Sequence, residues 1–210
     1  MRQFADWVKC WTDIKVKIIF EIGANYAQDA AGLAYFFKAK PEDVYAFEAH
    51  PQIAAAAEKL YNFRIYNLAV FNEEKELTFN SVQPDKTNNS GNSSLRYGLV
   101  SEGFVPIKVQ AIRMDNFMRK NNIAEIDFLK LDIEGCNWEA LSSFGNRLRD
   151  VKIIHVESEH EELWQGQKLW SDIKSILQKN GFELVFFQRY FAQSDSMWIQ
   201  KKFLKSELPK

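Results

Sequence analysis

The residues Ile18-Ile19-Phe20-Glu21-Ile22-Gly23-Ala24-Asn25 decide the fold of this chain. A short apolar run reaches a carboxylate and then a glycine, and an amphipathic helical pattern follows directly. Strand, tight turn and helix in this order are the layout on which α/β proteins bind nucleotide-like ligands at the carboxyl end of a strand. Glycine has no Cβ, so it permits the sharp turn and a close approach of the backbone to a ligand.

The bulk composition describes a chain that can form one domain with a complete core. It has 210 residues, of which 46% are hydrophobic, and a formal net charge of −1. This charge balance gives no reason to expect a nucleic acid or a membrane as a partner. The sequence shows neither a signal-peptide pattern nor an apolar run of membrane length, and Cys10 and Cys136 alone make no disulfide framework. We therefore expect a cytoplasmic protein, with its oligomeric state left open.

The first third of the chain alternates strand and helix patterns, which predicts a parallel sheet with right-handed crossovers. A leading helix over residues 1–14 is expected to pack on a main domain of residues 15–210. The expected strands are Val16–Ile22, Val44–Glu48 and Phe63–Val70, and the helices between them have apolar faces made of Ala30, Leu33, Ala34 and Phe37 and of Ile53, Ala56, Ala57 and Leu60.

The rest of the chain adds an antiparallel pattern and then returns to core strands. The polar stretch Gln83–Ser94 is either a surface connector or a lid that orders over a ligand. The expected strands are Glu76–Asn80, Val105–Ile112, Ile126–Ile133, Val151–Val156, Phe182–Phe187 and Met197–Ile199, and the clearest helix carries Leu169, Trp170, Ile173, Ile176 and Leu177.

Acidic residues lie at the carboxyl ends of the predicted parallel strands, at Glu21, Glu48, Asp132 and Glu157. The carboxyl ends of such strands share one edge of the sheet, where ligands bind. Buried carboxylates without partners are costly, so each of these is either functional or a helix cap or salt-bridge partner.

Glu48 indicates which ligand binds, because an acid about one βαβ step after the turn commonly holds a ribose diol. NAD(P) is the first candidate. However, the turn Gly23-Ala24-Asn25-Tyr26-Ala27-Gln28 lacks two of the three glycines of G-x-G-x-x-G, which approach a pyrophosphate. A ribose ligand without a pyrophosphate fits better, and S-adenosylmethionine is the commonest such cofactor. Its sulfonium and amino groups would also explain Glu21.

The stretch Ile126–Gly135 contains the pattern L-K-x-D-x-E-G at the end of a predicted core strand. Further short motifs lie at Phe20–Asn25, Val44–Pro51, Asn67–Val70 and Ser93–Leu95. Together they resemble the motifs of the FkbM-like family of class I S-adenosylmethionine-dependent methyltransferases, and Ile126–Gly135 is the most specific of them.

The resemblance implies a single Rossmann-like α/β domain over residues 15–210, with a seven-stranded, mostly parallel sheet and helices on both faces. It implies methyl transfer to oxygen, commonly to a sugar or polyketide-type hydroxyl. Ala27 stands where the family often has a second glycine, and its methyl group would either crowd the cofactor or shift the helix start. The cofactor-binding positions carried over to this chain are Glu21, Gly23, Ala24, Asn25, Glu48, Ala49, Ala69, Ser94 and Asp132.

Methyl transfer requires in-line alignment of the acceptor, and an alcohol acceptor must also lose a proton. Asp132 and Glu157 are the leading base candidates, followed by Glu134 and His160, while His155 and Glu159 approach from the same neighbouring strand. Lys130 shares a strand face with Asp132 and is expected more as a neutralising partner than as a catalyst. Asp132 and Glu157 could instead hold Mg²⁺, since oxygen ligands suit hard cations.

These observations predict an S-adenosylmethionine-dependent O-methyltransferase acting on a sugar or a glycosylated small molecule. The alternatives are methyl transfer to nitrogen or carboxylate, a cofactor-binding protein without catalysis and, last, an NAD(P)-dependent oxidoreductase. Acceptor specificity is expected from the polar stretch, from Trp138 and Trp164, and from residues 189–191.

Overall fold

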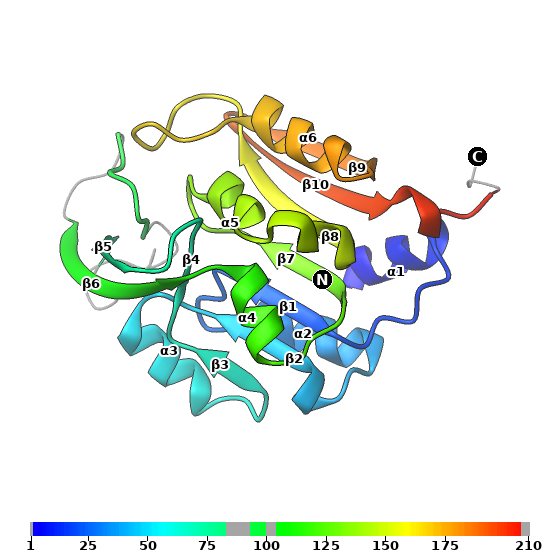
Figure 1. Cartoon of the computed structure of the whole chain (residues 1–210), viewed down its shortest axis with the longest axis horizontal. Helices are drawn as coiled ribbons and strands as arrows, with labels where there is room; N and C mark the ends of the chain where they lie inside the picture. Colours follow the sequence, from blue (N-terminus) through cyan, green and yellow to red (C-terminus); the bar gives the residue numbers. More distant parts are fainter. Residues whose placement is uncertain (1, 83–92, 100–103, 207–210) are drawn as a thin grey trace.

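The computed structural model of the protein describes residues 2–82, 93–99 and 104–206 (Figure 1). Most of the polar stretch Gln83–Ser94 therefore lies outside the described residues, and only Ser93 and Ser94 can be placed. Within the described ranges, no helix is long and apolar enough to cross a membrane.

A seven-stranded sheet forms the centre of the molecule, in the order β3-β2-β1-β7-β8-β10-β9. Every strand is parallel to its neighbours except β10, which is antiparallel to both β8 and β9. This confirms the predicted Rossmann-like sheet. Its strands are β1 Ile19–Ile22, β2 Val44–Phe47, β3 Arg64–Tyr66, β7 Ile126–Leu131, β8 Val151–Glu159, β9 Phe182–Tyr190 and β10 Gln193–Gln200.

Helices cover both faces of the sheet, as predicted (Figure 1). One core packs under α1 Arg2–Trp11, α2 Gln28–Phe37 and α3 Pro51–Glu58, and the other packs under α4 Met114–Lys120, α5 Asn137–Ser143 and α6 Trp170–Lys179. Successive residues of β1 alternate between the two cores, Ile19 entering the first and Phe20 the second, because side chains along a strand point to opposite faces. Short 3-10 helices lie at Pro41–Asp43, Gly145–Asp150 and Lys201–Phe203.

The predicted third strand, Phe63–Val70, is wrong as a single element. It divides into β3 and β4 Ala69–Val70, and β4 pairs with β6 in a second, three-stranded sheet of order β4-β6-β5. Asn67 marks the division, because its side-chain amide donates to the carbonyls of Glu48 and Ala49 as the chain crosses the end of β2. The remaining strands of the small sheet, β5 Glu76–Ser81 and β6 Val105–Ile112, are antiparallel as predicted.

Two further expectations need correction. Leu60, predicted on the apolar face of its helix, is 62% exposed, because α3 ends at Glu58 and Ala54 takes the inward position instead. The strand predicted to end at Val156 continues to Glu159, because β10 pairs with it from Ile153 to Glu159. Glu157 therefore lies within β8 rather than after it.

Candidate active site

The turn after β1 requires a glycine because it passes directly against the end of β7. Gly23 has a φ of +82°, and a Cβ there would lie 1.9 Å from the carbonyl oxygen of Asp132. The amides of Gly23 and Ala24 both donate to the carbonyl of Phe47, at 3.0 and 2.9 Å. The turn is thus fixed between the ends of β2 and β7, which open onto the same edge of the sheet.

Ala27 occupies the first position before α2 in a left-handed conformation, with a φ of +56° and a ψ of +29°. This conformation costs a non-glycine residue about 1–2 kcal/mol. The side chain is fully buried and does not line the cavity beside the turn. The methyl group of Ala27 therefore does not border the cavity, and the residue takes a strained conformation directly before α2.

Glu48 follows β2 and is held by backbone donors. Its Oε2 accepts a hydrogen bond from the amide of Asn25 and its Oε1 accepts one from the amide of His50, each at 2.7 Å. The residue is 7% exposed, and burial raises the pKa of its carboxyl group although these amides act in the opposite direction. Glu48 therefore ties the turn after β1 to the end of β2 and still borders the cavity between them.

Lys130 lies among three carboxylates. Its Nζ is 3.7 Å from Glu21 Oε1, 3.0 Å from Asp29 Oδ2 and 3.3 Å from Asp132 Oδ2. Burial alone would lower the pKa of this ammonium group, but the carboxylates outweigh burial and raise it. Lys130 thus stays charged and neutralises its neighbours, as its position beside Asp132 predicted.

Glu21 is buried beneath the start of α2. Its Oε2 accepts a hydrogen bond from the amide of Ala30 at 2.8 Å, and this amide belongs to the first turn of the helix, where a negative charge is favourable. Burial raises the pKa of Glu21, and Lys130 opposes that rise. The carboxylate therefore has structural partners within the protein in addition to its place on the cavity wall.

A cavity of about 320 Å³ lies at this edge of the sheet. Its walls come from the ends of β1, β2, β4 and β7, from β5 of the small sheet, and from residues 93–95. Every residue predicted to bind the cofactor borders it: Glu21, Gly23, Ala24, Asn25, Glu48, Ala49, Ala69, Ser94 and Asp132. The wall residues that the sequence did not single out include Tyr26, Asp29, Leu68, Phe79 and Cys136.

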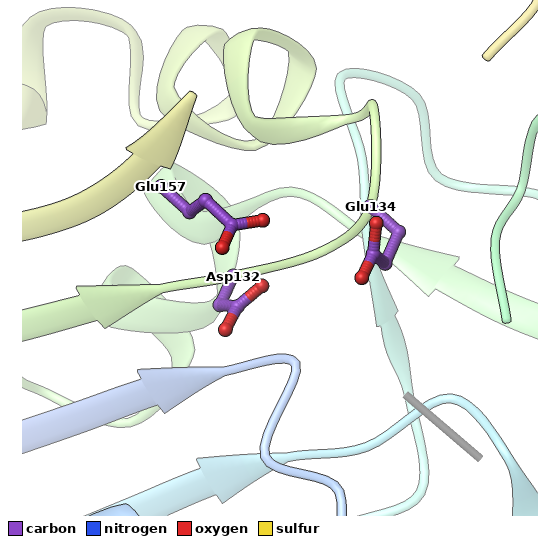
Figure 2. A group of neighbouring side chains, drawn as sticks. All are labelled: Asp132, Glu134 and Glu157. Atoms are coloured by element: carbon purple, nitrogen blue, oxygen red, sulfur yellow. The ribbon is translucent and has the colours of Figure 1, made fainter. Parts of the chain in front are cut away.

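Three carboxyl groups meet beside this cavity. Figure 2 shows Asp132 and Glu134, from the segment after β7, and Glu157, from β8, directed toward a common space. One carboxylate oxygen from each of the three residues lies within 4.8 Å of the other two. Asp132 and Glu134 line the cavity, whereas Glu157 lies outside its lining. The cluster thus extends from the cavity toward the neighbouring strands.

Burial and mutual repulsion change the protonation of this cluster. Burial, followed by the charges of Asp132, Glu134, Glu159 and Asp195, raises the pKa of Glu157 to about 9. Burial and the neighbouring acids also raise the pKa of Glu134 to about 8. Such crowding favours a positive charge nearby, because a cation would stabilise the ionised carboxylates.

The other residues predicted near the base have separate surroundings. Glu159 accepts a hydrogen bond from the amide of Gly135 at 3.2 Å, and burial raises its pKa to about 7. His155 Nε2 lies 3.3 Å from Asp195 Oδ1. His160 is not brought into the cluster: its Nε2 is 3.0 Å from Ser194 Oγ, and its ring packs near Trp170.

Arg96 holds the segment that carries Glu134, a role that no motif of the sequence predicted. Its Nε donates to the carbonyl of Gly135 at 2.8 Å, and Ser94 Oγ donates to the carbonyl of Glu134 at 2.6 Å. A third contact joins Arg96 to Glu139 of α5. Trp164 packs closely beneath the same segment, since a Cβ at Gly135 would lie 2.6 Å from its ring. Trp164 therefore supports the turn at Gly135 by packing against it.

Comparison with solved structures shows the fold. Methyltransferase FkbM from Methylobacillus flagellatus KT superposes with a TM-score of 0.57 at 12% identity, covering 88% of this chain and 44% of that one. Magnesium protoporphyrin IX methyltransferase (ChlM) from Synechocystis PCC 6803, solved with bound SAM, gives a TM-score of 0.51 at 11% identity, covering 95% of this chain and 79% of that one.

Comparison of sequences shows the family. Residues 21–184 match the family described as the methyltransferase FkbM domain. The 2-O-methyltransferase NoeI of Sinorhizobium fredii (strain NBRC 101917 / NGR234) is 23% identical over 188 residues, or 80% of this chain and 73% of that protein. The protein is therefore an S-adenosylmethionine-dependent methyltransferase. It belongs to the FkbM methyltransferase family, which sets aside the oxidoreductase alternative.

Proposed function

We propose that this protein transfers a methyl group from S-adenosylmethionine to a hydroxyl oxygen of a sugar or a glycosylated small molecule. The observation that carries the proposal is the carboxylate cluster of Asp132, Glu134 and Glu157 at the side of the cavity (Figure 2). Such a cluster provides a proton acceptor for a hydroxyl group beside the cofactor. The similarity to a protein named a 2-O-methyltransferase supports oxygen as the acceptor atom.

The residues around the cavity fit S-adenosylmethionine. Glu48 borders the cavity and would accept hydrogen bonds from ribose hydroxyl groups, and the narrow turn at Gly23 also borders the cavity. Leu68 and Phe79 add apolar surface suited to an adenine ring. When bound, the cofactor supplies a methyl carbon activated by a positively charged sulfur. The acidic side of the cavity suits that charge.

Asp132 is the leading base in this proposal. Asp132 lines the cavity, and its Oδ2 lies 3.3 Å from Lys130 Nζ. It also belongs to the carboxylate cluster, so it lies between the cavity proposed for the cofactor and the space beside Glu157. Glu157 is the second candidate, because a positive charge in the site would lower its raised pKa and make it a proton acceptor. Either residue would take the proton of the acceptor hydroxyl group.

A divalent cation is the alternative use of the same carboxylates. Asp132 and Glu157, with Glu134, offer oxygen ligands close enough to share one ion such as Mg²⁺. The cation would orient acceptor oxygens and lower the pKa of a hydroxyl group. In this version the three residues act as ligands, and chelation of the metal would abolish turnover.

The test is a methyl-transfer assay with isotopically labelled S-adenosylmethionine and three acceptor panels: carbohydrates and glycosides, amines, and carboxylic acids. Labelled methyl ethers on the carbohydrates are expected. Label only in amines or in esters would overturn the hydroxyl assignment. The assay is repeated after treatment with a chelator, and activity that persists would remove the metal version.

A further inference from the structure

The cavity is the proposed binding site of the cofactor, and the binding site of the methyl acceptor has still to be identified. Its lining includes no residue of β8, β9 or β10 among the residues that the structure describes. Glu157, in contrast, belongs to the carboxylate cluster and lies on β8. The sheet continues from β8 to β10 and then β9, so the surface beyond the cluster is formed by the β9–β10 hairpin.

The strand register places a set of polar side chains on one face of this hairpin. Asp195 pairs with Glu157, and Gln193 pairs with both Glu159 and Tyr190. Directly opposed residues of antiparallel strands project to the same face. These residues therefore share the face that carries Glu157, next to the cluster.

The same face changes character along β10. Met197 and Ile199 are buried in the core that also holds Val8 of α1. Toward the carboxyl edge of the sheet, Tyr190 is 44% exposed and the Asp195 side chain is 25% exposed. Helix α1 thus covers the apolar part of this face, and the polar part beside Glu157 is open to a ligand.

The polar groups on this face are ordered by one another. Gln193 Nε2 donates to Glu157 Oε1 at 2.7 Å, and Tyr190 lies close enough to Asp195 for the two side chains to interact. Burial would raise the pKa of Asp195, but its contacts with His155 and Tyr190 lower it, so this carboxylate is ionised. The face offers an amide, an ionised carboxylate and a half-exposed aromatic ring within one hairpin.

We propose that Tyr190, Gln193 and Asp195 form the acceptor-binding surface of the enzyme and that they bind a hydroxylated ring such as a sugar. Amide and carboxylate groups bind hydroxyl groups, and the exposed ring of Tyr190 packs against the C–H face of a sugar. Gln193 has a second part, because its hydrogen bond fixes the direction of the Glu157 carboxyl group. An acceptor on this surface meets the cluster from the side opposite the cofactor cavity. The inference rests on the proposed function and names the surface that function uses.

The test compares hairpin variants with a matched control. Tyr190→Ala removes the ring, Tyr190→Phe removes only the hydroxyl group, and Gln193→Ala removes the donor to Glu157. Glu183→Ala is the control, because Glu183 lies at the other end of β9 in an exposed pair with Lys201. Calorimetry measures the Kd of S-adenosylhomocysteine, and steady-state assays measure kcat and KM for the carbohydrate that the wild type methylates best.

All variants are expected to bind S-adenosylhomocysteine within a factor of two of the wild type. Tyr190→Ala should raise KM about 10-fold, the loss of one aromatic packing contact in a binding site. Tyr190→Phe should raise KM less, and Gln193→Ala should lower kcat as well as raise KM. Unchanged KM in both Tyr190→Ala and Gln193→Ala, with active wild type, would overturn the acceptor surface alone. A wild type that methylates no carbohydrate would overturn the proposed function and this inference with it.

Discussion

Two groups of carboxylates lie at the same edge of the sheet, and they differ in burial and in their hydrogen-bond partners. Glu21 and Glu48 are almost completely buried, but each accepts hydrogen bonds from backbone amides. Asp132, Glu134 and Glu157 are less buried and crowd one another. The first group is built into the fold, since it joins a turn, a strand end and a helix start. The second group adds repulsion that the fold does not need, which indicates a chemical role.

The largest effect is expected at the crowded group, in turnover rather than in binding. Asp132→Asn keeps the volume of the side chain but removes its ability to accept a proton. We expect kcat to fall about 10²- to 10⁴-fold, the usual contribution of a general base. The affinity for S-adenosylhomocysteine should change by less than about 5-fold, which is about 1 kcal/mol. Labelled methyl transfer and calorimetry measure the two quantities, and full activity in this variant would discard Asp132 as base or metal ligand.

The next effect is expected at the backbone-anchored group, in binding and stability together. Glu48→Ala removes the acceptor for two amides and for the ribose, so cofactor affinity should fall about 10-fold or more. The free energy of unfolding should also fall, by about 1–3 kcal/mol for the unpaired buried donors. Glu42→Ala, at an exposed acid before the same strand, serves as the control for calorimetry and urea unfolding. Affinity within a factor of two of the wild type would refute the ribose assignment.

A smaller effect is expected in the pH dependence of stability, at Glu157 of the crowded group. The pKa of Glu157 in the folded protein is about 9, above its ordinary value of 4.5, so the folded chain keeps a proton that the unfolded chain releases. The stability of the wild type should therefore fall as the pH rises from about 4.5 toward about 9. Glu157→Gln does not titrate, and its Tm relative to the wild type should increase across this range by a few degrees, at ~2–4 °C per kcal/mol. A difference in Tm that is independent of pH would contradict the raised pKa of Glu157.

The smallest effect is expected at Ala27. Ala27→Gly relieves the left-handed strain but adds freedom to the unfolded chain and removes a buried methyl group, so stability should change by less than about 1 kcal/mol. Cofactor affinity should stay within a factor of two, because the side chain does not line the cavity. A tighter-binding variant, detected by calorimetry, would show that the methyl group hinders the cofactor after all.

The sequence predicted the parts of the structure that depend on local pattern. The alternation of strand and helix patterns predicted the main sheet. The positions of the strand ends predicted that Glu48, Asp132 and the residues around Gly23 lie at one edge of it. It missed the crossing of the chain after Asn67, which turns one predicted strand into two and brings Phe79 of the small sheet to the cavity. Asp29 and Arg96 were missed for a similar reason: their roles arise from contacts with Lys130 and with the segment after β7, which are distant in sequence.

For Glu21, the sequence predicted the location of the residue beside the turn but not all of its partners. The sequence placed it beside the turn as an acid for the cofactor's positive groups, and the residue does border the cavity. The structure adds that its oxygens already face the amide of Ala30 and the ammonium group of Lys130. No pattern in the sequence reveals which of a carboxylate's oxygens is already engaged, because that depends on how α2 packs over β1.

The most direct test of the account is a crystal structure with S-adenosylhomocysteine bound. We expect its ribose hydroxyl groups to lie within hydrogen-bond distance of Glu48, and its sulfur to face the space between Asp132 and Glu157. A molecule bound away from the turn at Gly23, or one whose sulfur points away from the carboxylate cluster, would contradict it.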